Sequence, residues 1–306
     1  MLKRLNIYFK EMYPILPRLG LGMMIFLEIY FIVFCNSGKT IADFSTAPMD
    51  IISMIVCGFT ISSFLCWLRI ADDFKDYELD CRLFKERPLP SGRVTKKDLR
   101  TVLWILIPTT LILNAIFCWK NFIFCIILYT YGYFMAMWFF QKHKIQKSLP
   151  MALVTHNPVQ MIMNIYVISF VVIQYQLPVF TVTNVLAVFT LYFPALIWEI
   201  TRKIRAPKDE TEYVTYSKLF GYKKATNFAL IVTLIDIVTN FVLVWNLNKI
   251  SVVVLALLVS WMTYKFCEFK KDPTKFKLVS IVERYTYIQE TIMILTIIRY
   301  LAFGKI

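Results

Sequence analysis

The sequence predicts an all-α polytopic membrane protein, a bundle of about nine transmembrane helices whose N-terminus is cytoplasmic. Three observations indicate this fold class. Hydrophobic residues make up 58% of the 306 residues and the mean hydropathy is +0.60, whereas soluble domains are roughly 45–50% apolar. Apolar stretches of about 20 residues, enough to cross a bilayer as a helix, recur along the chain. Basic residues gather in the loops of one side.

Nine apolar stretches, bounded by charged residues, Pro or Asn, are the predicted spans. They lie near residues 17–35, 49–70, 98–118, 121–140, 149–173, 177–199, 222–246, 250–267 and 278–303. Because no soluble segment of domain size separates them, we expect one transmembrane domain over residues 1–306. Lys3 and Arg4 precede the first span, but no small-residue cleavage site follows it, so a removed signal peptide is not expected.

The net charge of +14 follows the topology of these spans. With a cytoplasmic N-terminus, most of the 34 Lys and Arg residues fall in cytoplasmic loops, as the positive-inside rule requires. Those on the opposite side are Lys39, Lys120, Lys249, Arg299 and Lys305, and Arg284 lies inside the last span. No soluble basic domain is left to bind nucleic acid. The seven Cys residues are scattered without metal-ligand spacing, and we interpret them as core-filling thiols.

An acidic motif continues the second span out of the membrane, with aspartates at positions 72, 73, 76 and 80. On a helix, Asp72, Asp76 and Asp80 form one stripe with Asp73 beside it. Like charges so close repel one another, and divalent cations are the obvious compensation. The alternative is a solvated helix end whose residues, including Lys75, Glu78 and Arg82, form ordinary surface pairs.

The segment after this motif favours the functional alternative. Two prolines and a glycine between Arg87 and Arg93 predict a rigid turn that holds basic groups beside the carboxylates. Thr95 and Asp98 then have the spacing of a capping box for the third span.

The order Asp-Asp-x-x-Asp-x-x-x-Asp, followed by Arg87-Pro-x-x-Ser-Gly, resembles the first signature of the UbiA superfamily of intramembrane prenyltransferases. The resemblance implies nine helices around a central cavity, an isoprenyl diphosphate substrate and Mg²⁺ as cofactor. It also implies an active site that faces the cytoplasm. The metal would be held by Asp72, Asp73, Asp76 and Asp80, with Arg69 and Arg87 on the diphosphate.

A second acidic loop in that family follows the sixth span and completes a two-metal site. Here that position holds a loop from Glu199 to Glu212, and Ala206 stands where the family pattern suggests another acid. By resemblance, Glu199 and Asp209 are catalytic and Asp209 and Glu210 bind metal. The basic residues of the loop favour direct phosphate binding, since guanidinium and ammonium groups neutralise phosphate without a metal; they are Arg202, Lys203, Arg205 and Lys208. The alternative is that they are basic only for topology.

Further polar residues are assigned by the same resemblance. Lys142 or Lys144, after the fourth span, would bind diphosphate. The cavity is predicted to be lined by His156, Asn157, Asn164 and Tyr216. Polar side chains inside a span are costly and mark functional sites by default, but a satisfied helix–helix contact is an equal alternative, above all for Asn164. The same default applies to Glu28, Asp236 and Glu290.

Three functions remain open at this stage. The first is a prenyltransferase that transfers the prenyl group to a lipophilic or aromatic acceptor within membrane lipid. The second is a terpene cyclase of the same superfamily, in which the chain's own double bond captures the cation and no acceptor is needed. The third is a transporter or non-catalytic protein on this fold, which would be expected to carry its charges at the bilayer midplane.

Overall fold

The computed structural model of this chain describes residues 1–210 and 214–304, and these are built from helices with no strand among them. Contacts divide the chain into two compact units. Unit 1 comprises Met1–Tyr30, Ser45–Lys142 and Ile165–Gln176. Unit 2 comprises Phe31–Phe44, His143–Asn164 and Leu177–Ile306. The division falls within helices α2 (Ile15–Asn36) and α9 (Val159–Tyr175).

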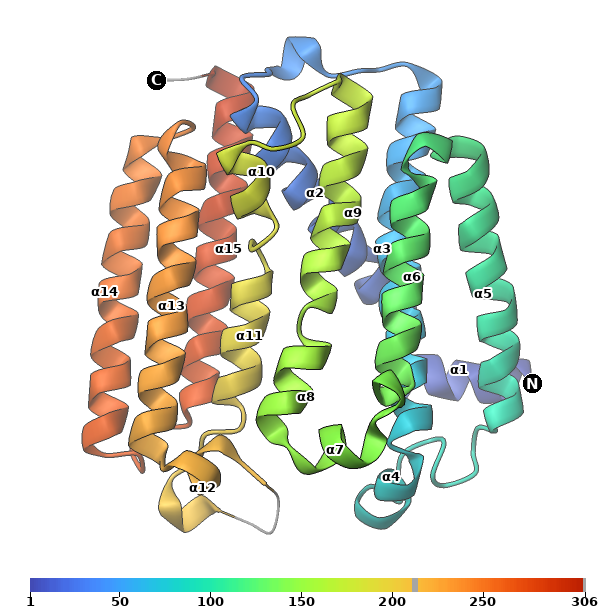
Figure 1. The fold of residues 1–306 in the computed structure, drawn as a ribbon, viewed down its shortest axis with the longest axis vertical. Helices are drawn as coiled ribbons and strands as arrows, with labels where there is room; N and C mark the ends of the chain where they lie inside the picture. Colours follow the sequence, from blue (N-terminus) through green and yellow to red (C-terminus); the bar gives the residue numbers. More distant parts are fainter. Residues whose placement is uncertain (211–213, 305–306) are drawn as a thin grey trace. The chain divides into compact units, whose positions relative to one another are not determined.

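Unit 1 contains parts of α2 and α9 together with several complete helices. These are α1 (Leu2–Glu11), α3 (Pro48–Lys75), α4 (Tyr77–Leu83), α5 (Lys96–Phe117), η2 (Trp119–Asn121), α6 (Phe122–Ala136) and η3 (Trp138–Phe140). Figure 1 shows α5 and α6 side by side, joined through a short turn, with α1 lying across the lower end of α5.

Local signals explain where these helices begin. Pro48 starts α3, where its missing N–H costs nothing. The predicted capping box is confirmed at α5, since the Thr95 hydroxyl accepts from the backbone of Asp98 while the Asp98 carboxylate accepts from the backbone of Thr95. Gly132 of α6 lets the helix approach Trp67 of α3, because a Cβ there would lie 2.0 Å from the indole ring.

Polar side chains join the helices of unit 1 within the bundle. Asn114 of α5 donates to the Thr60 hydroxyl of α3 at 2.7 Å, and Tyr166 of α9 donates to Asn114 Oδ1 at 2.7 Å. All three are buried. Hydrogen bonds of this kind hold helices together where lipid supplies no hydrophobic driving force.

Unit 2 is dominated by three long helices. Its elements are η1 (Ile41–Asp43), α7 (Lys142–Lys147, whose first residue belongs to unit 1), α8 (Leu149–His156), α10 (Val182–Ala187), α11 (Tyr192–Thr201), η4 (Pro207–Asp209), α12 (Tyr216–Phe220), α13 (Tyr222–Trp245), α14 (Lys249–Lys271) and α15 (Leu278–Phe303). Helix α14 packs on both α13 and α15, and Figure 1 shows α13 and α14 side by side. Helix α12 lies at the lower end of α13 in the same view.

Two predicted spans are interrupted. The fifth is split at Asn157 and Pro158 between α8 and α9, where Pro158 lacks the amide that would continue the helix. The sixth is split between α10 and α11, where Leu191 takes a left-handed conformation with φ 60°. Asn164 donates to the carbonyl of Val188 at 2.9 Å and to that of Thr190, so its amide satisfies backbone oxygens that the break exposes.

The chain is an integral, multi-pass membrane protein. Seven spans among the described residues are long and apolar enough to cross a bilayer: Ile15–Asn36, Pro48–Lys75, Lys96–Phe117, Leu149–Tyr175, Val182–Thr201, Tyr222–Trp245 and Lys249–Lys271. The two other predicted spans are helical, but α6 has 15 residues and α15 carries four charged ones. The count of nine crossings and the cytoplasmic N-terminus stay predictions.

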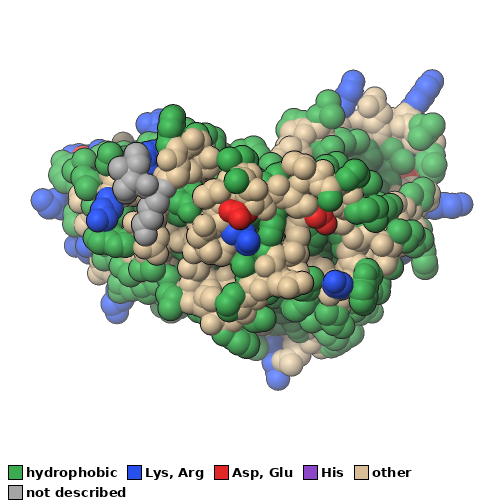
Figure 2. Space-filling model, turned by 90° about the horizontal axis from the view of Figure 1, so that it is seen from above, with side chains coloured by type: hydrophobic (Ala, Val, Ile, Leu, Met, Phe, Trp, Pro, Cys, Tyr) green, Lys and Arg blue, Asp and Glu red, His purple; other side chains and the backbone are tan. Residues whose placement is uncertain are grey.

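The surface agrees with a lipid environment. Large apolar side chains are exposed along the spans, among them Trp104, Ile105, Leu257 and Ile298. Figure 2 looks onto the end of the molecule that is uppermost in Figure 1, and hydrophobic side chains predominate over scattered charged ones there. Exposed apolar surface of this extent is unusual for a soluble monomer and is expected where lipid covers it.

Candidate functional site

The first acidic motif lies where α3 meets α4. Asp72 and Asp73 belong to the last turn of α3, Asp76 stands between the two helices, and Asp80 lies in α4. The predicted continuous stripe is therefore bent at Asp76, whose φ of −98° and ψ of 7° depart from helical values, although its backbone bonds to Asp72 and Asp80 persist. Aspartate is a weak helix former, and like charges four residues apart destabilise a helix.

Three of the four aspartates are paired with cations. Asp73 accepts from Arg69 at 2.7 Å and from the hydroxyl of Tyr8 at 2.5 Å. Asp80 pairs with Arg87 at 2.8 Å, and Asp72 with Lys75 at 3.0 Å. Lys75 thus forms an ion pair within the motif, although its side chain is only 8% exposed and the pair is not an ordinary surface pair.

Asp76 differs from its neighbours. Its carboxylate forms no side-chain hydrogen bond or ion pair within residues 1–210 and 214–304. Partial burial raises its pKa, the positive charge of Lys75 opposes the shift, and the negative charges of Asp72, Asp80 and Asp73 add to it. A carboxylate whose charge is disfavoured by its surroundings is where an added cation gains most.

The turn after α4 is closed by a backbone hydrogen bond and contains a glycine with positive φ. The carbonyl of Pro88 accepts from the amide of Val94 at 3.0 Å, and Gly92 adopts φ +75°, which disfavours other residues. The guanidinium of Arg87 lies 4.0 Å from the ring centre of Phe84. Arg93 binds both carboxylate oxygens of Glu11. Arg87 is therefore held beside the acidic motif by its ion pair with Asp80 and by an aromatic face.

Tyr8 is a residue that the sequence reasoning missed. Burial and the negative charge of Asp73 raise its pKa, so the phenol stays protonated and donates. The spacing of Arg4, Tyr8 and Glu11, which places them on one face of a helix, was the available signal.

The first motif supplies the right donor types for Mg²⁺ without presenting an assembled metal centre. Carboxylate oxygens are the ligands that Mg²⁺ prefers, and Asp76 has none of the competing cations that its neighbours have. Over the described part of the chain, however, no three acidic, His or Cys side chains gather closely enough to hold a metal ion. A cation would have to compete with Arg69, Lys75 and Arg87 for their carboxylates.

A strained aromatic turn precedes the predicted lysines. Trp138, Phe139 and Phe140 have φ of 52°, 47° and 57°, all in the left-handed region. The ammonium of Lys75 lies 4.6 Å from a ring centre of Trp138. Strained backbone often marks functional segments. The two candidate lysines, Lys142 and Lys144, follow directly and are exposed.

The second motif, in unit 2, is organised by basic residues. Glu199, near the end of α11, pairs with Arg202 at 2.5 Å and with Lys203 at 2.7 Å. The Arg202 guanidinium also lies 5.1 Å from the ring centre of Trp198. These contacts hold Arg202 and Lys203 next to each other, which is an arrangement suited to an anion.

The late acidic pair of this motif is split between two environments. Both oxygens of Glu210 accept from hydroxyls, one from Thr215 at 2.7 Å and the other from Ser217. Asp209 is exposed. Glu212, part of the predicted acidic group, lies outside the described residues. Ala206 is only 3% exposed, so the position where the family pattern suggests an acid is packed by a methyl group.

The predicted cavity residues have varied surroundings. Asn164 forms hydrogen bonds to neighbouring segments: its amide donates to three backbone carbonyls, and its side-chain oxygen accepts from Gln160 at 3.0 Å. Tyr216 is buried and donates to the carbonyl of Leu149. His156 Nδ1 lies 3.1 Å from the carbonyl of Ala152, and Asn157 Nδ2 is buried without a hydrogen bond to any described residue. The cavity role of these four residues stays a prediction.

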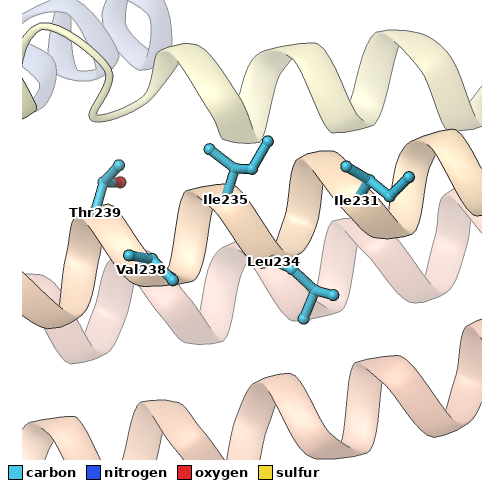
Figure 3. Close-up of a pocket in the computed structure, with 5 residues that line it drawn as sticks. All are labelled: Ile231, Leu234, Ile235, Val238 and Thr239. Carbon is cyan, nitrogen blue, oxygen red and sulfur yellow. The ribbon is translucent and has the colours of Figure 1, made fainter.

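An apolar groove on α13 lies apart from these motifs in the chain. It has a volume of about 330 Å³ and is lined by Ile231, Leu234, Ile235, Val238 and Thr239. Figure 3 shows that all five side chains come from the one helix. It contains no charged group and offers nothing for acid–base or phosphate chemistry.

The chain is similar to known proteins in sequence and in fold. A sequence model of the UbiA prenyltransferase family matches residues 31–281. Among solved structures, the chain is similar to one described as digeranylgeranylglyceryl phosphate synthase in membranes, with 14% identity and a TM-score of 0.67, over 98% of this chain and 99% of that chain. At such identity the likeness shows the fold. A comparison with curated proteins finds no match.

Proposed function

This chain belongs to the UbiA prenyltransferase family, and on that premise we propose that it is a Mg²⁺-dependent intramembrane prenyltransferase that ionises an isoprenyl diphosphate and transfers the prenyl group to an acceptor. The observation that carries the proposal is the first acidic motif. Four aspartates lie within nine residues at the end of a membrane span, and Asp76 carries a charge that its surroundings disfavour.

In this proposal Asp72, Asp73, Asp76 and Asp80 hold the metal. Bound Mg²⁺ would supply positive charge that stabilises the departing diphosphate. Arg69 and Arg87 already lie against carboxylates of the motif. Their guanidinium groups are suited to neutralise phosphate oxygens that reach the same carboxylates.

We assign the second motif to phosphate binding. Arg202 is 42% exposed and Lys203 lies beside it on Glu199, so both can bind an anion directly. Glu210 is assigned to closing its loop, because both of its oxygens already accept hydroxyl hydrogens. Asp209 remains the candidate metal ligand here, and Lys142 and Lys144 remain candidate phosphate ligands.

The prenyl chain is proposed to lie among apolar side chains within the membrane, where water cannot capture the allylic cation. Aromatic faces stabilise such a cation. The active site is assigned to the cytoplasmic side, because the first motif and the basic loops share that side in the predicted topology. The partners are an isoprenyl diphosphate, a lipophilic or aromatic acceptor and membrane lipid.

The test is turnover by purified protein in lipid nanodiscs. Prenyl diphosphates of several chain lengths are supplied with Mg²⁺, without and then with candidate acceptors, and released diphosphate and lipid products are measured. We expect product that depends on Mg²⁺ and disappears with EDTA. Protein that releases no diphosphate under any of these conditions would contradict the proposal and favour a non-catalytic role.

A terpene cyclase is the second candidate, and the packed Ala206 together with the engaged Glu210 favours it. Both depart from the acidic second loop that the family pattern suggests. The same assay separates the candidates, because a cyclase releases a cyclic hydrocarbon or alcohol when no acceptor is present.

A further inference from the structure

Helix α1 presents three polar side chains on one face. Arg4, Tyr8 and Glu11 are four and three residues apart, which places them along one stripe of a helix. The helix lies outside residues 31–281, where the family match falls. Each of the three side chains contacts a different segment around the first acidic motif.

The two ends of α1 are fixed by bidentate ion pairs. Arg4 binds both oxygens of Asp98, at 2.7 Å and 2.8 Å, where α5 begins. Glu11 receives two bonds from Arg93 in the turn after α4, at 2.5 Å and 2.8 Å. Such fork-like pairs fix orientation as well as distance. Helix α1 is therefore anchored on both sides of Tyr8 by contacts that do not involve Tyr8.

Tyr8 occupies the middle of this clamp and is completely buried. Its ring belongs to a core cluster with Ile70 of α3, Leu89 of the turn and Leu99 of α5. Its hydroxyl donates to Asp73 Oδ2 at 2.5 Å, while Arg69 donates to Oδ1 of the same carboxylate at 2.7 Å. Asp73 is 5% exposed, so these two donors set the orientation of its carboxylate.

We propose that Tyr8 is a positioning residue for the first acidic motif: its hydroxyl fixes the carboxylate of Asp73 and thereby sets the affinity of the motif for a divalent cation. The proposal rests on the proposed function. Hydrogen bonds to a ligating carboxylate orient it, and their loss typically weakens metal binding by about 10–100-fold. Through Tyr8, the N-terminal helix α1 thus contributes to the proposed metal site, although the aspartates of the motif all lie outside α1.

A purely structural role for Tyr8 makes a different prediction. If the hydroxyl served only to dock α1, its removal would lower stability and leave cation affinity unchanged. Because two ion pairs and the buried ring dock α1 independently, we expect Tyr8→Phe to keep the helix in place. The matched control is Tyr13→Phe, since Tyr13 is also buried and donates its hydroxyl to a backbone carbonyl, that of Ser62.

The experiment titrates Mn²⁺, as a paramagnetic stand-in for Mg²⁺, into the full-length protein in nanodiscs and measures bound ion by electron paramagnetic resonance. Turnover is measured in parallel against Mg²⁺ concentration. For Tyr8→Phe we expect the Mn²⁺ dissociation constant and the half-saturating Mg²⁺ concentration to rise about 10–100-fold, with the rate at saturating Mg²⁺ little changed. Tyr13→Phe should match wild type in both.

A double-mutant cycle isolates the contact. In an Asp73→Asn background, Tyr8→Phe should cause no further loss of Mn²⁺ affinity, because the carboxylate through which it acts is gone. Equal Mn²⁺ affinity in wild type and Tyr8→Phe would overturn the positioning role. So would unfolding of Tyr8→Phe, because the hydroxyl would then serve the fold. Wild-type protein that neither binds Mn²⁺ nor turns over would instead remove the proposed function, and this inference with it.

Discussion

The two motifs differ in which charge they leave unsatisfied. In the first, Asp76 lies among three other aspartates, and these neighbours are paired with Arg69, Lys75 and Arg87. In the second, Glu199 shares its charge between Arg202 and Lys203, and Glu210 is bound by hydroxyls. We therefore expect the first region to bind a cation and the second to bind an anion. If this expectation holds, the pairing of the side chains, and not the number of charged residues, decides which ligand each motif prefers.

The largest effect is expected at Asp76. Asp76→Asn should lower turnover by about 10²–10³-fold, the size expected when an electrostatic contact to developing charge is lost. The same change should leave thermal stability equal or higher, because it removes a charge that burial and three aspartates disfavour. Rates and unfolding midpoints are measured on one preparation. Asp43→Asn, in η1 outside both motifs, is the control, and a fully active Asp76→Asn would end the metal-ligand role.

The second motif is tested at Arg202. Arg202→Ala should raise the KM for prenyl diphosphate about 10–100-fold, since a charge-assisted hydrogen bond contributes roughly 1.5–3 kcal/mol. The Mg²⁺ dependence should not change, which distinguishes this motif from the first. The exposed Lys224 at the start of α13 provides the control through Lys224→Ala. A shift in Mg²⁺ dependence with unchanged KM would reverse the assignment of the two motifs.

A smaller effect, on stability, is expected at Ala206, where the chain departs from the family pattern. Ala206→Asp places a carboxylate at a buried position, and an unsatisfied buried polar group costs roughly 1–3 kcal/mol. We expect a lower unfolding midpoint and no gain in Mn²⁺ affinity. Ala206→Ser is the milder control for the added volume. Tighter Mn²⁺ binding by Ala206→Asp would show that the second loop is a metal site lacking one ligand.

The smallest effect is expected at the exposed pair of Glu11 and Arg93. Hydrogen bonds from Arg93 lower the pKa of Glu11, so the pair stabilises the protein above the ordinary pKa of glutamate. This contribution is lost as the pH falls through the lowered pKa. Glu11→Gln should therefore lower the unfolding midpoint slightly at neutral pH and have no effect in more acidic solution. A difference that grew as the pH fell would contradict this sign.

The fold was largely predictable because its signals are local. Hydropathy locates the helices, and Pro48, the Thr95–Asp98 capping box and Pro158 mark boundaries that the structure has. The break before Leu191 also has a local signal, because Pro194 lies in the first turn of α11 and lacks the amide that would bond the carbonyl of Thr190. The sequence does not show that Asn164, far away in the chain, donates to that carbonyl instead.

The positions of the acidic motifs and one short-range pairing were predictable, but their long-range partners were not. Asp80 and Arg87 are seven residues apart and the turn between them made the pairing foreseeable. Tyr8 and Asp73 are separated by 65 residues, and a ten-residue polar helix gives no hydropathy signal. Which carboxylate oxygens stay available depends on such long-range contacts, so spacing alone could name candidate ligands without choosing among them.

At the left-handed turn Trp138–Phe140, the side chains and the backbone favour different residue types. L-residues in this conformation cost roughly 1–2 kcal/mol apiece, and glycine or asparagine would relieve that cost. A sequence optimised for stability alone would have glycine or asparagine at these positions. This one places three aromatic rings there instead, one beneath the ammonium of Lys75 and another stacked on Phe134. In this turn the contacts of the aromatic rings are retained despite the conformational strain of the backbone.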